Sequence, residues 1–330
     1  MKAFRLHNPR TIEEALQLLE PERVSSLKTA VLAGGMDLVT ELKEYLAQPD
    51  DIVNLKGIEG LSGIEAEPGG GVRIGALCTL ASLEEHPVLQ RTHAVLTQAA
   101  ASVASVQIRS QATVGGNLNQ RPRCWYYRNE ESVCLKKGGT ECFSYGGLNK
   151  YNAILGGGPS YIVHPSDLAP ALLALDASVE LVSRKGSRTV KIEKYFTLPS
   201  EGDVLRETAL APGEILRSVV IPPQKDGMRS TWLKFKEKSS FDWALSAVAL
   251  CAVTDGKTIR EARVALGGVA PVPWRAKAAE AALANAPMER KLFEAAAEAA
   301  LRGAEPLSQN AYKVPLTKGL LIRALESLAG

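Results

Sequence analysis

Two glycine pairs constrain the fold of this 330-residue chain more than any other feature. Gly34-Gly35 follows an apolar segment, residues 29–33, that we expect to be a strand, and precedes a helical pattern over residues 37–46. Gly115-Gly116 forms a second turn, within residues 111–118. Glycine lets backbone N–H groups approach an anion without a Cβ in the way, and a helix N-terminus adds a favourable dipole. The two turns therefore suit the two phosphates of a dinucleotide, although neither is the GxGxxG fingerprint of a Rossmann unit.

Length and charge exclude several classes of protein. A chain of 330 residues predicts two or three domains. The 39 Lys and Arg nearly balance the 36 Asp and Glu, and no basic run occurs, so the sequence predicts no nucleic-acid partner. No apolar run approaches the ~20 residues of a membrane span. The N-terminus shows no secretory signal, so we expect a cytoplasmic, reducing location in which the five cysteines are free thiols or metal ligands.

Local patterns indicate mixed helices and strands. Thr11 begins a capping-box pattern that predicts a helix as far as Leu19. One long helix is expected over residues 88–103, and a hairpin over residues 178–192. Residues 222–227, rich in proline and glycine, are the best linker candidate, and the alanine-rich segment from about 276 to 328 reads as helix. The apolar surroundings of Cys78 and Cys251 predict ordinary core thiols.

The two glycine turns and the segments that follow them resemble motifs of one family: the FAD-binding medium subunit of the molybdenum hydroxylases, the xanthine dehydrogenase and carbon monoxide dehydrogenase family. Ala-Gly-Gly-Met-Asp-Leu at 33–38 matches the family's Ala-Gly-Gly-Thr-Asp-Leu, and Ala-Thr-Val-Gly-Gly-Asn at 112–117 matches Ala-Thr-Ile-Gly-Gly-Asn. Residues 165–172 match the family's aspartate segment, and residues 267–273 resemble part of its C-terminal domain. Each motif is weak alone, but four in the same order make the resemblance specific.

The resemblance implies an α+β fold with a two-lobed FAD-binding (PCMH-type) domain and a small C-terminal domain of a sheet plus helices. We expect the first lobe to span residues 1–55 and the second residues 56–223, with FAD between them. The second lobe would carry a cysteine-containing insertion over about 121–160. The C-terminal domain would span residues 228–330.

The family pattern also implies which residues contact the cofactor. The candidates are Leu32, Ala33, Gly34, Gly35, Met36, Asp37, Leu38, Thr113, Gly115, Gly116, Asn117, Asp167, Leu216 and Lys236. The two glycine turns would wrap the pyrophosphate. Asp167 would accept a hydrogen bond from a flavin-side hydroxyl, or would simply cap a helix beginning at Leu168. Leu216 would lie against the isoalloxazine, and Lys236 would approach the flavin or stay a solvated strand residue. Met36 replaces the family's threonine, and since backbone donors remain we expect binding to survive.

The insertion resembles the loop that holds an extra [4Fe–4S] cluster in the 4-hydroxybenzoyl-CoA reductase branch and in certain periplasmic aldehyde oxidoreductases. Cys124, Cys134 and Cys142 are its candidate ligands. A cubane cluster normally takes four thiolates, and this chain has Ser160 where those relatives have the fourth. A cluster with an unusual fourth ligand and a packed loop without a cluster both stay open at this point.

The function implied by the resemblance is electron transfer. This chain would carry FAD and no catalytic residue of its own. A large molybdopterin subunit would oxidise the substrate, and a small subunit with [2Fe–2S] clusters would pass electrons to FAD here and on to an external acceptor. Two alternatives remain: a self-contained flavin reductase of the same superfamily, and a non-enzymatic iron–sulfur scaffold.

Overall fold

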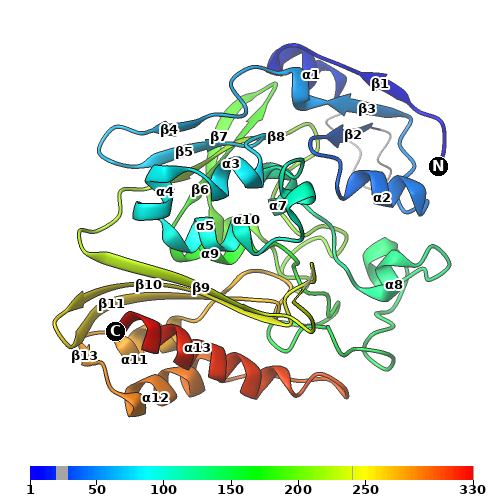
Figure 1. Ribbon diagram of the computed structural model, residues 1–330. Helices are drawn as coiled ribbons and strands as arrows, with labels where there is room; N and C mark the ends of the chain where they lie inside the picture. The colour runs from blue at the N-terminus through cyan, green and yellow to red at the C-terminus, as the bar shows by residue number, and fades with distance from the viewer. Residues whose placement is uncertain (20–28, 240, 330) are drawn as a thin grey trace.

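Three β-sheets and the helices between and beneath them make up the protein in the computed structural model, which describes residues 1–19, 29–239 and 241–329 (Figure 1). The chain begins in the sheet at the top of Figure 1 and ends in the helices at the bottom. No helix in these ranges has the length and apolar character needed to cross a membrane.

The first sheet is parallel and small. Its strands, in spatial order, are β1 (Arg5–His7), β3 (Asp51–Asn54) and β2 (Thr29–Leu32). Helix α1 (Ile12–Leu18) follows β1, and α2 (Leu38–Lys43) follows β2. Thr11 caps α1 by accepting a hydrogen bond from the Glu14 N–H, so the predicted helix start is confirmed. Helix α2 is shorter than the helix that the sequence predicts there.

The second sheet is antiparallel and has five strands. Their spatial order is β4 (Ile64–Ala66), β5 (Val72–Gly75), β8 (Ile215–Ile221), β6 (Ser178–Ser183) and β7 (Gly186–Lys191). One face packs with the helices α3 (Leu80–Glu84), α5 (Ala94–Ala101) and α9 (Leu168–Ala174) around a common apolar core. The predicted hairpin is β6–β7, whereas the central strand β8 is not among the strands expected from the sequence.

The third sheet lies between two layers of helices. Its strands are β9 (Met228–Phe235), β10 (Ser246–Asp255), β11 (Thr258–Gly267), β12 (Trp274–Arg275) and, beside β11, β13 (Ala286–Pro287). Along β10, Ala249 and Cys251 join the core shared with α5 and α9, while Val248 and Leu250 join the opposite core. The second layer consists of α11 (Lys277–Leu283), α12 (Arg290–Ala300) and α13 (Lys313–Ala329). The C-terminal segment predicted as helix is thus three helices with breaks between them.

Short elements connect these layers. They are the helices α4 (Pro87–Thr92), α6 (Val106–Arg109), α7 (Val114–Leu118), α8 (Trp125–Arg128) and α10 (Ile192–Tyr195), with 3-10 turns at Leu55–Gly57 and Leu135–Lys137. The single helix expected over residues 88–103 is wrong, because α4 ends at Thr92 and the backbone of His93 leaves the helical region at φ −137° before α5 starts. The His93 side chain is buried, so the break allows it to enter the core.

Candidate cofactor site

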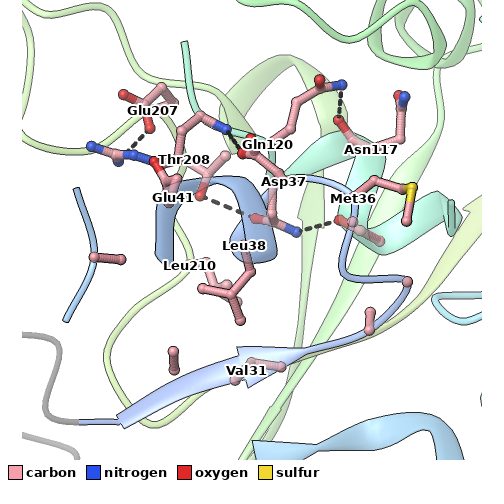
Figure 2. Close-up of a pocket in the computed structure, with 18 of the residues that line it drawn as sticks. Val31, Met36, Asp37, Leu38, Glu41, Asn117, Gln120, Glu207, Thr208 and Leu210 are labelled. Carbon is pink, nitrogen blue, oxygen red and sulfur yellow. Dashed lines mark hydrogen bonds and ion pairs between the residues drawn. The ribbon is translucent and has the colours of Figure 1, made fainter. Parts of the chain in front are cut away.

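A large cavity lies where the first sheet meets the second. Its volume is about 880 Å³, which is within the range of cofactor sites. Both glycine turns line it, as do residues 205–208 and 210–216 from the approach to β8 (Figure 2). The residues predicted to bind a cofactor that line this cavity are Ala33, Gly34, Gly35, Met36, Asp37, Leu38, Thr113, Gly115, Gly116, Asn117, Asp167 and Leu216. The structure therefore brings together two turns that are distant in sequence.

The first glycine turn presents unpaired backbone donors. Gly35 has φ +80°, a conformation that favours glycine. A Cβ on Gly34 would overlap the carbonyl oxygen of Gln111, so this glycine allows the first turn to pack against the approach to the second. Within the described ranges the N–H groups of Gly34, Gly35 and Met36 donate no hydrogen bond. These N–H groups are therefore available to an anionic ligand.

The second glycine turn is fixed by hydrogen bonds and packing on one side and faces the cavity on the other. Thr113 caps α7, and its Oγ1 accepts a hydrogen bond of 3.1 Å from the Gly116 N–H. The Gly115 N–H donates to the Ala76 carbonyl at 2.8 Å, and a Cβ on Gly115 would stand 3.0 Å from Ala76. A Cβ on Gly116 would meet only the Thr113 hydroxyl. Gly115 thus serves packing, while Gly116 leaves space at the cavity.

Asp37 ties the first turn to the insertion. Its carboxylate accepts a hydrogen bond from the Arg121 backbone N–H at 2.6 Å and one from the Arg128 guanidinium at 2.8 Å. Arg123 forms an ion pair with the same carboxylate at 2.9 Å. The Asp37 side chain is therefore an anchor for the start of the insertion.

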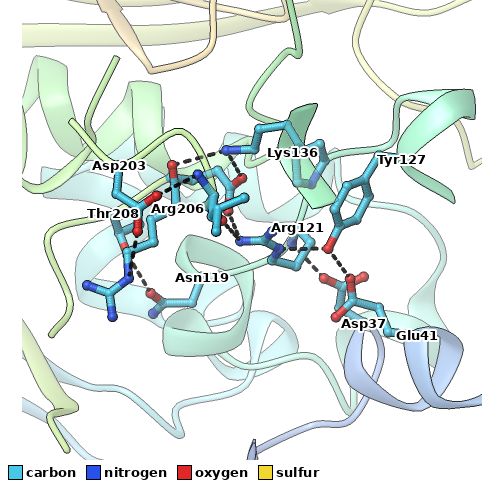
Figure 3. Close-up of polar contacts among 12 residues, drawn as sticks. Asp37, Glu41, Asn119, Arg121, Tyr127, Lys136, Asp203, Arg206 and Thr208 are labelled. Atoms are coloured by element: carbon cyan, nitrogen blue, oxygen red, sulfur yellow. Dashed lines mark hydrogen bonds and ion pairs between the residues drawn. The ribbon is translucent and has the colours of Figure 1, made fainter. Parts of the chain in front are cut away.

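A chain of buried polar groups continues from that anchor (Figure 3). The Tyr127 hydroxyl donates to Glu41 at 2.8 Å and accepts from Arg121 at 2.8 Å. Arg121 in turn binds Glu207 at 2.6 Å, and Lys136 binds the same carboxylate at 2.5 Å. Burial raises the pKa of Glu41 and lowers that of Lys136. The insertion is thus bound to both α2 and the 200–210 segment, and it forms one wall of the cavity.

Asp167 forms a buried ion pair that the sequence did not predict. Its Oδ2 lies 2.6 Å from the Lys234 ammonium, and both side chains are almost fully buried. Burial raises the pKa of Asp167, and the adjacent Lys234 opposes that shift. The helix-capping alternative does not describe this side chain, because the Ser166 hydroxyl accepts the Ala169 N–H instead. Asp167 is therefore held by a lysine on β9 at the edge of the cavity.

Two predicted site residues lie elsewhere. Leu32 is part of β2 and is not among the residues that line the cavity. The Lys236 ammonium donates to the Ser239 carbonyl at 3.3 Å in an exposed position, and Lys236 does not line the cavity either. Lys234, two residues earlier, is the lysine on β9 that contacts Asp167. Lys234 lies within β9, whereas Lys236 follows the last residue of the strand.

A second cavity, of about 300 Å³, adjoins the first. Arg123, Pro165, Asp167 and Trp243 line both cavities. The Arg123 guanidinium lies 4.5 Å from the centre of the Trp243 ring, within cation–π distance. Four residues of these cavities were not predicted from the sequence: Arg121, Arg123, Lys136 and Trp243. The dense run of arginines and aromatics at 121–128 is a local signal for the two arginines.

The three cysteines of the insertion converge with Ser160. Cys124, Cys134, Cys142 and Ser160 line one small cavity of about 10 Å³. The Ser160 hydroxyl is buried and has no hydrogen-bond partner. Among the described residues no three ligands are arranged around a single metal ion. Tyr127 and Lys136 line both this cavity and the large one, so the cysteine site is next to the candidate cofactor site.

The other two cysteines are core residues, as predicted. Cys78 and Cys251 are each 1% exposed. Burial raises the pKa of Cys78 to about 11 and that of Cys251 to about 12. Both are inert thiols under physiological conditions.

Comparison with known proteins places this geometry among flavoproteins. A family model described as the FAD binding domain in molybdopterin dehydrogenase matches residues 2–224, and one described as the CO dehydrogenase flavoprotein C-terminal domain matches residues 232–328. The chain is 35% identical to the aldehyde oxidoreductase FAD-binding subunit PaoB of Escherichia coli K12, over 98% of both chains. It is 28% identical to the carbon monoxide dehydrogenase medium chain of Hydrogenophaga pseudoflava, over 98% of this chain and 96% of that one.

Solved structures give the same result. The structure of carbon monoxide dehydrogenase from Hydrogenophaga pseudoflava contains a chain that matches with a TM-score of 0.76 at 27% identity, covering 98% of this chain and 96% of that chain. A structure of Cu,Mo-CO dehydrogenase matches with a TM-score of 0.77 at 26% identity, covering 99% and 98%. The α+β architecture with a C-terminal sheet-plus-helices unit, predicted from the sequence, is confirmed by these matches.

Proposed function

This chain belongs to the family of FAD-binding subunits of molybdenum hydroxylases, and from that premise we propose how its residues hold FAD and which partners it serves. The protein is the FAD-carrying, electron-transferring subunit of a multi-subunit oxidoreductase. Bound FAD supplies the capacity to accept two electrons and to release them to another acceptor. The chain's own task is to bind, orient and shield that group.

The observation that carries the binding proposal is the pair of glycine turns facing one cavity of about 880 Å³. The free N–H groups of Gly34, Gly35 and Met36 would donate to one phosphate of the pyrophosphate. Gly116 would leave room for the other phosphate beside α7. Met36 contributes through its backbone, so its difference from the family's threonine removes only a side-chain hydroxyl.

Two further residues that line the cavity suit the flavin. Leu216 is a buried apolar residue on β8 that lines the cavity, as an isoalloxazine ring would require. Asp167, fixed by Lys234, would accept a hydrogen bond from a hydroxyl of the flavin side chain. The side chains of the insertion would close this part of the cavity to water.

We propose that the partners are a large molybdopterin subunit and a small subunit carrying [2Fe–2S] clusters. The support is that several relatives are named as medium chains or FAD-binding subunits of larger enzymes. Electrons would enter from the [2Fe–2S] clusters and leave to an external acceptor. We propose a cytoplasmic location because all five cysteines are free thiols, which a reducing compartment maintains.

We also propose that the insertion binds a [4Fe–4S] cluster. Three thiols from separate parts of the insertion line one cavity, and iron–sulfur clusters are held by cysteine thiolates. Thiolates on one metal ion such as zinc would lie ~4 Å apart, since each bond is ~2.3 Å long. Cluster ligands bind different irons and stand farther apart. The sulfurs of Cys124, Cys134 and Cys142, which line the cavity of about 10 Å³, would hold the irons of such a cluster.

Gly116→Val tests the FAD assignment within the assembled complex. Its side chain would fill the space beside α7 without meeting neighbouring backbone, so the fold should persist while FAD is lost. The matched control is Gly319→Val, an exposed helical glycine with open space around it. After mixing with substrate, the variant complex should still show reduction of its [2Fe–2S] clusters, but no flavin reduction. Stoichiometric FAD and normal flavin reduction in Gly116→Val would contradict the proposal.

A further inference from the structure

We propose that the hydroxyl oxygen of Ser160 is the fourth ligand of the cluster in the insertion. The inference rests on the proposed function, in which Cys124, Cys134 and Cys142 supply the other three ligands. It assigns to this chain a cluster held by three sulfurs and one oxygen. Such a cluster has one iron whose ligand differs chemically from the rest.

Burial is the first reason. Ser160 is 1% exposed, and its Oγ has no hydrogen-bond partner. A buried hydroxyl without a partner is unfavourable, and nearly all such groups in folded proteins are satisfied. The Ser160 hydroxyl lines the cavity that the three cysteine residues also line. An iron atom at that place would satisfy the hydroxyl oxygen.

Elimination of the other oxygen and nitrogen groups is the second reason. The Ser144 hydroxyl is bound to the Cys142 sulfur at 3.0 Å, and the Tyr126 hydroxyl accepts the Leu148 N–H at 2.8 Å. Tyr127 is bound to Glu41 and Arg121, and Lys136 to Glu207. Among the described residues that line this cavity, Ser160 alone has a side-chain oxygen or nitrogen without a partner. The remaining cysteines, Cys78 and Cys251, lie in a different core.

Binding of the Ser160 oxygen to iron is an acid–base step that needs no oxidant. As the iron–oxygen bond forms, the Ser160 hydroxyl loses its proton to solvent, just as each cysteine loses its thiol proton. Three thiolates and one alkoxide carry the same charge as four thiolates, so the oxidation state of the core is unchanged. Alkoxide is a harder donor than thiolate and favours the ferric state. The cluster should therefore have a lower reduction potential than one with four cysteines.

The experiment uses the full chain, purified without oxygen and reconstituted with ferric iron, sulfide and a thiol reductant, which supplies the electrons that convert part of the iron to the ferrous state. The variants are Ser160→Cys and Ser160→Ala, with Ser144→Ala as the matched control, because Ser144 lines the same cavity but has a partner. Iron and sulfide content, the EPR spectrum and the reduction potential are measured for each. FAD content and circular dichroism show whether each variant is folded.

The expected result has three parts. The unmodified chain and Ser144→Ala hold a four-iron cluster, Ser160→Ala yields a three-iron cluster with its characteristic EPR signal in the oxidised state, and Ser160→Cys keeps four irons at a higher potential. If Ser160→Ala keeps four irons with an unchanged EPR spectrum and potential, the serine is not a ligand, although the cluster proposal stands. A three-iron cluster in the unmodified chain also overturns the serine assignment. Absence of iron from the folded, FAD-containing chain overturns the cluster proposal itself.

Discussion

Gly34 packs directly against the backbone carbonyl of Gln111, so that the two glycine turns are in direct contact. The two residues are far apart in the sequence, with β3 and β5 between them, so the tertiary fold brings them together. A Cβ at Gly34 would overlap that oxygen. The first turn is thus positioned by the second, and both turns line the cavity.

Gly34→Ala should separate the two turns. Overpacking against backbone typically costs about 1–3 kcal/mol, so we expect a lower melting temperature and a markedly weaker affinity for FAD. Gly146→Ala is the control, since a Cβ at Gly146 meets nothing within 4 Å. Differential scanning fluorimetry and flavin titration measure both effects. Equal melting temperatures and FAD affinities for Gly34→Ala and Gly146→Ala would show that the contact does not position the turn.

Tyr127→Phe should loosen the insertion. The change removes the hydrogen bond to Glu41 and the one from Arg121, and it leaves the buried Glu41 carboxylate without that donor. A loss of about 1–3 kcal/mol is expected for such unsatisfied groups. Limited proteolysis should cut within residues 121–160 faster than in the unmodified chain. Tyr145→Phe, at an exposed tyrosine, should leave the cleavage rate unchanged; unaltered cleavage in Tyr127→Phe would argue against the anchoring role.

Lys313 makes the stability of the protein depend on pH. Its buried ammonium donates to the carbonyls of Tyr151 and Gly268, and burial lowers the pKa of Lys313 to about 7 from its usual 10.5. Between pH 7 and 10.5 the unfolded chain binds more protons than the folded chain, so the free energy of unfolding rises with pH in this window and is constant below it. The unmodified chain should therefore gain up to about 4 kcal/mol over Lys313→Met from pH 7 to pH 10.

Urea unfolding of both chains at pH 7 and pH 10 measures this gain. The two carbonyls lose their donor in Lys313→Met at either pH, so that loss cancels when the two differences are compared. A stability difference that is the same at pH 7 and pH 10 would show that Lys313 keeps one protonation state throughout.

The local features of the fold and site could be predicted from the sequence. The Thr11 cap and the β6–β7 hairpin follow from short-range chemistry, and the glycine turns follow from the need for close backbone approach. The buried states of Cys78 and Cys251 follow from their apolar surroundings. The family motifs supplied the architecture, which local patterns alone do not determine.

Long-range pairings could not be predicted in the same way. Strand β8 lies between β5 and β6 in the second sheet, and its place depends on partners distant in sequence. The ion pair of Asp167 with Lys234 joins α9's start to β9, and the contacts of Arg121 and Lys136 with Glu207 span an equally long stretch of chain. From the sequence alone, charged residues in an insertion are expected to be exposed to solvent. Nothing nearby in the sequence indicates that they will pair with a distant carboxylate.

The FAD content of the purified, folded chain tests the central claim most directly. Flavin released by heating is quantified from its absorption and divided by the protein concentration, after incubation with excess FAD and removal of the unbound part. The account predicts one FAD per chain. A folded chain that holds no flavin, and takes up none when FAD is added, would contradict it.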